Sequence, residues 1–170
     1  MLRRLVVTSA VVANLLLVDQ VVKAAAVASL KGRPPRVVLE AFFNLAYVEN
    51  RGCAWGMLQG HAWPLAAFGL LALAFLFWKR EAFFPAGAHG RIAEWLLYGG
   101  IVGNLIDRVV RGHVVDMFDV HWGVHHFPCF NVADAYITVA AAILVLAGVF
   151  PRLGGHAPKA AAKDGGDGRA

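Results

Sequence analysis

Four apolar segments, each close to the length needed to cross a membrane, divide the chain. They cover residues 5–30, 63–78, 92–110 and 132–150. A helix that crosses the hydrocarbon core of a bilayer needs about 20 mostly apolar residues. The pattern therefore predicts an all-α membrane bundle of four transmembrane helices, built as a single domain from residues 1–150.

The more polar segments between these spans predict a small sheet outside the membrane. Bulky residues alternate with smaller or polar ones over 43–48, and residues 114–122 alternate in a similar way. A period of two favours β-strands over helices. We expect an extracytoplasmic β-platform within residues 34–60, with a turn at 50–52 and a short interfacial helix over 53–58.

Composition supports a membrane protein and argues against a nucleic-acid surface. The 170 residues are 59% hydrophobic and 16% charged, which is too apolar for an ordinary soluble domain. The net charge is +5, but the basic residues are scattered and mostly flank the apolar segments. With four spans, both termini lie on the same side of the membrane. Nine Lys and Arg residues lie on that side and six on the other. This bias predicts cytoplasmic termini and polar loops on the outer face.

The two ends of the chain need separate interpretation. Residues 151–170 are rich in Gly and Ala and basic, and we expect a disordered cytoplasmic tail. The first apolar segment also fits a cleaved signal peptide, with Arg3 and Arg4 before it and a small-residue site at 26–28. Asp19 and Lys23 favour a retained helix, because their i,i+4 spacing allows an ion pair that a signal peptide does not need.

Asp116 and Asp134 are the strongest candidates for chemistry, because both lie at the edges of apolar segments. A carboxylate at a membrane helix centre costs about 2.5–3.5 kcal/mol, and less near the interface. Two carboxyl groups about 3 Å apart share a proton, so one can activate water while the other donates to a carbonyl oxygen. Helix caps and ion pairs are the alternative roles. Asp119 competes with Asp116, since on a strand the two point to opposite faces.

Other polar residues form smaller groups with structural alternatives. Asn104 shares a helical face with Asp107 or Arg108, and Arg108 either pairs with a carboxylate or extends its charge toward the interface. A buried pair of Asp19 and Lys23 would hold helices together. Asn44, Asn50 and Gly52 are interpreted first as turn formers. Cys53 and Cys129 are interpreted as two unrelated thiols, with a single bridge between them as the alternative. A metal site that combines Asp116 or Asp119 with histidines is a further alternative, but no HExxH or similar framework is present among His113, His121, His125 and His126.

Five motifs in order resemble the lipoprotein signal peptidases, or signal peptidase II, over residues 10–150. They are DQVVK at 19–23, NLAYVENRG at 44–52, GGIVGNLIDR at 99–108, GHVVDMFD at 112–119 and FNVAD at 130–134. The resemblance implies an aspartic endopeptidase of the bacterial inner membrane without a cofactor. Its catalytic residues would be Asp116 and Asp134, supported by Asp19, Lys23, Asn50, Gly52, Asn104, Asp107, Arg108 and Asn131.

The same resemblance implies the substrate and the partners. Members cleave prolipoproteins just before a Cys that carries diacylglycerol, and they are inhibited by globomycin. We therefore expect diacylglyceryl-modified prolipoproteins and membrane lipid as partners, no nucleic acid, and a monomer with its active site near the periplasmic face. A transporter and a non-catalytic scaffold are alternatives from the polar residues alone, although a transporter is usually built from repeats and the chain shows none. The chain departs from the commonest family residues at Arg51, Cys53 and Trp55.

Overall fold

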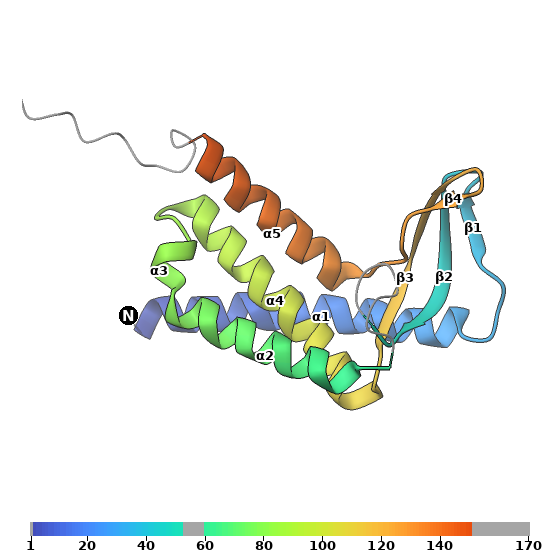
Figure 1. Ribbon diagram of the computed structural model, residues 1–170, viewed down its shortest axis with the longest axis horizontal. Coiled ribbons are helices and arrows are strands. Elements are labelled where there is room, and N and C mark those ends of the chain that lie inside the picture. The colour runs from blue at the N-terminus through green and yellow to red at the C-terminus, as the bar shows by residue number, and fades with distance from the viewer. Residues whose placement is uncertain (1, 53–59, 151–170) are drawn as a thin grey trace, which may run out of the picture.

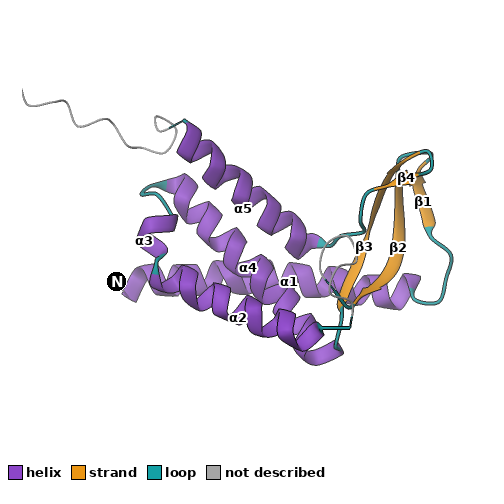
Figure 2. Cartoon of the chain, in the orientation of Figure 1, coloured by secondary structure: helices purple, strands orange, loops and turns teal. Residues whose placement is uncertain are grey.

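The computed structural model describes residues 2–52 and 60–150. Four long helices form a bundle. A sheet stands at one end of it, where the first helix extends farther than the other three (Figures 1 and 2). The elements in order are α1 Leu2–Leu30, β1 Arg36–Leu39, β2 Phe43–Asn50, α2 Ala62–Trp78, α3 Arg80–Phe83, α4 Ala88–Arg111, β3 Val114–Trp122, β4 His125–His126 and α5 Val132–Val149.

Each predicted apolar segment lies on one of the long helices. Two of these helices, α1 and α5, are long and apolar enough to cross a membrane. Only 6% and 11% of their most apolar windows are buried, so they are not the core helices of a soluble protein. The 17-residue α2 is apolar but slightly shorter. The remaining long helix, α4, carries charged side chains near both ends. These side chains belong to the two polar clusters described below.

Glycines on α4 allow its neighbours to approach closely. A Cβ atom at Gly99 would lie 3.1 Å from Leu15 of α1. At Gly100 it would lie 2.5 Å from the carbonyl oxygen of Ala133 at the start of α5. Gly103 is similarly confined, because its Cβ would lie 2.7 Å from a carboxylate oxygen of Asp19. The glycines therefore bring α1, α4 and α5 together at the level of the polar residues.

The sheet has the antiparallel order β1-β2-β3-β4. The strands expected over 43–48 and 114–122 are both present. The expected platform within 34–60 is incomplete, however, because β3 and β4 from residues 114–126 supply the other strands. The sequence pattern places strands locally but does not indicate which distant strand supplies the missing backbone hydrogen bonds. Here β3 pairs with β2, with Val48 opposite Asp116 and Asn50 opposite Val114.

A small apolar cluster attaches the sheet to the bundle. Ala26 and Leu30 at the end of α1 pack with Val115 and Met117 of β3. The first apolar segment is thus an integral part of the fold, as the ion-pair argument favours over a signal peptide. The helix expected over 53–58, the tail, and Cys53 with its alternative bridge to Cys129 lie outside the described residues.

Candidate active site

Asp116 and Asp119 point to opposite faces of β3, as the strand geometry requires. Asp116 is 1% exposed and faces the end of the helix bundle. Asp119 lies on the other face, where it accepts hydrogen bonds from Asn44 at 3.1 Å and is bonded to Nδ1 of His126 at 2.6 Å. Of these two aspartates, Asp116 is therefore the one that lies beside the polar residues of α4 and α5.

Asp134 is positioned by the N-terminus of α5. The side-chain oxygen of Asn131 accepts a hydrogen bond from the backbone N–H of Asp134 at 3.0 Å. In return, the Asp134 carboxylate accepts from the backbone N–H of Asn131 at 3.1 Å. This reciprocal pair is a capping box, which satisfies two otherwise unpaired donors of the helix end. Asn131 is therefore the N-cap of α5, and it fixes the half-buried carboxyl group of Asp134.

Two side-chain amides connect Asp116 with Asp134. The Nδ2 atom of Asn131 donates to Oδ1 of Asp116 at 2.7 Å and also lies 3.2 Å from Oδ1 of Asn104. The Nδ2 atom of Asn104 donates to Oδ1 of Asp134 at 2.7 Å. Asn50 donates to the second oxygen of Asp116 at 3.0 Å. Each of the four carboxyl oxygens therefore has a hydrogen-bond donor, and the two acids belong to one continuous network.

The environment of Asp116 favours its protonated form. Burial, followed by the negative charge of Asp134, raises the pKa of Asp116 to about 7. Hydrogen bonds from Asn131 and Asn50 act in the opposite direction but do not cancel the burial. A carboxyl group with this pKa holds or releases a proton near neutral pH, which is the property required of a catalytic acid or base.

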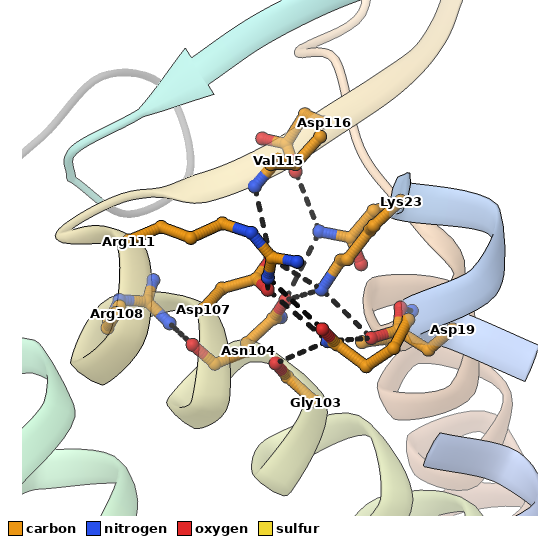
Figure 3. A network of polar contacts seen from close by, with 12 residues as sticks. Asp19, Lys23, Gly103, Asn104, Asp107, Arg108, Arg111, Val115 and Asp116 are labelled. Carbon is orange, nitrogen blue, oxygen red and sulfur yellow. Dashed lines mark hydrogen bonds and ion pairs between the residues drawn. The ribbon is translucent and has the colours of Figure 1, made fainter. Parts of the chain in front are cut away.

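A buried ionic network lies behind the two acids, as Figure 3 shows. The fully buried ammonium of Lys23 lies 3.0 Å from Asp19 and 2.9 Å from Asp107, and it donates to Oδ1 of Asn104 at 3.1 Å. Arg111 also pairs with Asp107. Two cations thus balance two carboxylates, which is the condition under which buried charges are tolerated.

This network also forms hydrogen bonds with the backbone next to both acids. Asp107 accepts from the backbone N–H of Val115, next to Asp116, at 3.1 Å. Asp19 accepts from the backbone N–H of Ala133, next to Asp134, at 3.0 Å. The Asp19 carboxylate therefore lies at the positive end of α5, where the helix dipole favours a negative charge. The ion pair predicted from the spacing of Asp19 and Lys23 is present and has this wider role.

The turn after β2 is fixed from α4. Arg108 donates to the carbonyl oxygen of Gly52 at 3.1 Å and to that of Asn104 at 3.4 Å. The backbone N–H of Gly52 donates to the side-chain oxygen of Asn50 at 3.0 Å. Because that oxygen is occupied, the amide nitrogen of Asn50 is the atom that faces Asp116. The predicted turn at 50–52 thus orients a side chain of the site.

The structure therefore gathers the ten predicted site residues in one network, and it adds two that the sequence interpretation does not single out. Gln20 donates to Asp19 at 3.1 Å and to Asp107 at 3.2 Å, and it accepts from Arg111 at 3.1 Å. Arg111 follows Asp107 by one helical turn, and Gln20 lies within the first motif, so spacing offers a signal for both. Asn44 lies apart from the network, on Asp119.

Comparisons with known proteins show which proteins this chain is similar to. The family model of signal peptidase (SPase) II matches residues 11–150. A lipoprotein signal peptidase of Syntrophotalea carbinolica is 43% identical over an alignment of 133 residues that covers 76% of this chain and 83% of that protein. One of Clostridium acetobutylicum is 37% identical over 137 residues, covering 80% and 89%.

A solved bacterial membrane enzyme also shares the fold. Its structure, determined by the in meso method at 2.3 Å resolution, superposes with a TM-score of 0.69 and 29% sequence identity. The match covers 91% of this chain and 93% of that one. Together with the family model, which spans both aspartates and the network behind them, these similarities show that this chain belongs to the signal peptidase II family.

Proposed function

We propose that Asp116 and Asp134 are the catalytic pair with which this chain, an aspartic-type signal peptidase II, removes signal peptides from prolipoproteins. The observation that carries the assignment is their connection through Asn104 and Asn131, with the pKa of Asp116 raised to about 7. Two acids in one network retain a single proton between them over the working pH range. The pair then contains both a base and an acid.

The proposed reaction needs only these two groups and a water molecule. The ionised carboxylate accepts a proton from water, whose oxygen attacks the scissile carbonyl carbon. The protonated carboxyl group donates to the carbonyl oxygen, which stabilises the negative charge that develops there. When the tetrahedral intermediate collapses, the C–N bond breaks and the departing amine takes a proton from the pair. The pair returns to its singly protonated state.

We propose that all four long helices cross the membrane, with both termini cytoplasmic and the active site near the outer face. Large apolar side chains on α2 are exposed, including Phe68 at 71% and Leu71 at 68%. Lipid would cover them, whereas contact with water would be costly. The excess of Lys and Arg on the side of the termini supports this orientation in a bacterial inner membrane.

We further propose that the substrate is a prolipoprotein whose Cys already carries diacylglycerol, cleaved just before that Cys by a monomeric enzyme. Asp116 lies on β3 and Asp134 at the start of α5. These elements meet where the bundle adjoins the sheet (Figure 1), so the acyl chains can remain in lipid while the peptide extends along the sheet. A transporter or scaffold role has no separate observation in its favour.

The test is cleavage of a purified precursor by variants of the reconstituted enzyme, followed by a gel-shift assay. We expect Asp116→Asn and Asp134→Asn to reduce the rate by about 10²–10⁴, the usual contribution of a general acid or base. Asp119→Asn is the matched control, because Asp119 lies on the opposite face of the same strand. Near-normal cleavage by either folded site variant would overturn the assignment. Lipidated and unlipidated precursors, with and without globomycin, test the substrate class.

A further inference from the structure

A second polar cluster lies at the end of the bundle opposite the sheet, where α1 begins and α2 meets α3 (Figure 1). Its centre is Glu94 of α4, which is 1% exposed. Arg80 donates twice to one carboxylate oxygen of Glu94, at 2.7 and 3.1 Å. Arg4 donates to the other oxygen at 3.2 Å. These residues are far from the aspartates along the helices and have no part in the proposed reaction.

An open cavity of about 840 Å³ lies beside this cluster. Its basic lining residues are Arg4, Lys79 and Arg80, against a single lining carboxylate at Glu81. The buried Glu94 neutralises one of the cations, so the cavity remains net positive. An anion that enters it therefore meets an excess of basic groups.

The arginine donors are held in place before any ligand binds. A guanidinium group has five N–H donors, and Glu94 receives one from Arg4 and two from Arg80. Donors therefore remain on both side chains. Because the ion pairs to a buried carboxylate already restrict these side chains, less conformational entropy is lost when they bind an anion. Planar groups of this kind are well suited to phosphate oxygens.

The apolar side chains beside the cavity indicate which kind of phosphate compound fits it. Phe77 is 56% exposed and Trp78 is 73% exposed, and both line the cavity. Lys79 places its ammonium over the Trp78 ring, 4.0 Å from the centroid. Exposed Trp beside Lys and Arg is typical of the level at which lipid headgroups meet the acyl region. A soluble anion would gain nothing from these rings, whereas a phospholipid would also contact them with its glycerol and acyl groups.

We propose that this cavity binds the headgroup phosphate of an anionic phospholipid from the leaflet at the N-terminal end of α1. The phosphate contacts Arg4, Lys79 and Arg80, while the acyl chains lie along Phe77 and Trp78. The bound lipid joins α1 to the α2–α3 corner on the side away from the active site. The inference rests on the membrane placement in the proposed function but is independent of the roles of the two aspartates.

The test is lipid binding to the full chain in detergent, measured by native mass spectrometry with phosphatidylglycerol and phosphatidylcholine. We expect preferential retention of phosphatidylglycerol and a roughly fivefold loss of its affinity in Lys79→Gln and in Arg4→Gln, since each Lys or Arg near a headgroup contributes about 1 kcal/mol. Arg91→Gln is the matched control. It removes an equal charge from an exposed position at the same end of the bundle that does not line the cavity.

Three outcomes would overturn the proposal. One is equal retention of the two lipids. Another is an equal loss in Arg91→Gln, which would indicate diffuse attraction to the charged surface. The third is displacement of the lipid by millimolar inorganic phosphate, which would indicate a site for soluble anions. Precursor cleavage measured on the same samples reports on the proposed peptidase function separately, because lipid retention does not require turnover. Thermal unfolding of Arg4→Gln checks that the helix end remains intact.

Discussion

The side-chain nitrogen of Asn131 lies 2.7 Å from Oδ1 of Asp116, while the oxygen of the same amide caps the helix that carries Asp134. One side chain therefore stabilises the start of α5 and donates to the buried acid on β3. The two tasks use different atoms of the amide, so substitutions can separate them.

Replacing Asn131 by Ser and by Ala should separate the helix cap from the amide donor. A Ser hydroxyl still caps the helix but lacks the amide nitrogen that donates to Asp116, so Asn131→Ser should lose activity and about 1–3 kcal/mol for the buried acceptor left without its donor. Asn131→Ala should lose about 1 kcal/mol more, because the cap is lost as well. Thermal unfolding and precursor cleavage measure the two effects. Equal activity in Asn131→Ser and wild type would contradict a role for the amide nitrogen.

The raised pKa of Asp116 predicts a pH-dependent effect of Asp116→Asn on stability. Because the folded state holds this proton up to a pH of about 7, whereas the ordinary pKa of an aspartate is about 3.8, ionised Asp116 destabilises the fold above pH 7 and has no such effect below pH 4. A pKa raised from 3.8 to about 7 corresponds to about 4 kcal/mol, from which about 1 kcal/mol is subtracted for a disrupted hydrogen bond. Asp116→Asn should therefore be more stable than wild type at pH 8.

That advantage should disappear as the pH falls toward 4, where both proteins are neutral at this position. Denaturant unfolding in micelles at several pH values measures the difference. A constant difference at all pH values would contradict a raised pKa. For wild type, the cleavage rate should fall at alkaline pH as the pair loses its shared proton, with an apparent pKa that belongs to both acids together.

Removing the ammonium of Lys23 should destabilise the fold strongly. Lys23→Met leaves Asp19 and Asp107 buried without their shared cation, and breaking a buried ion pair in this way costs about 3–5 kcal/mol. Lys31→Met removes the same charge at an exposed position and should change stability by less than about 0.5 kcal/mol. Thermal unfolding in the same detergent compares them, and similar midpoints for the two variants would show that the network adds little.

A methyl group at Gly103 should disturb the contact between α4 and its neighbours. Its Cβ would lie 2.7 Å from Asp19 and 3.2 Å from Ala133, so either a helix or the Asp19 carboxylate must move. We expect Gly103→Ala to lose about 1–3 kcal/mol, the usual effect of overpacking, together with much of the activity. Gly148→Ala has open space around it and should gain up to about 1 kcal/mol from helix propensity. Unfolding midpoints and cleavage rates measure both.

Local patterns identify many of the parts from the sequence. The apolar segments lie on helices, and the strand predicted over 114–122 has the same bounds as β3. The N-cap at Asn131 and the pairing of Asp19 with Lys23 depend on neighbours within one helical turn. The opposite orientations of Asp116 and Asp119 follow from their odd separation on a strand. Each of these features is determined by backbone geometry over a few residues.

The sequence did not determine which distant parts meet. Asn50 reaches Asp116 across 66 positions, and Asp19 reaches Ala133 across 114. The pairing of β2 with β3 also enlarged the platform beyond 34–60, and Glu94 acquired two arginines from separate elements. The length of an apolar segment and the alternation along a strand are local patterns. They carry no information about a partner far along the chain. Only packing of the helices and sheet places these charges in contact, because a buried charge must find a partner wherever the fold supplies one.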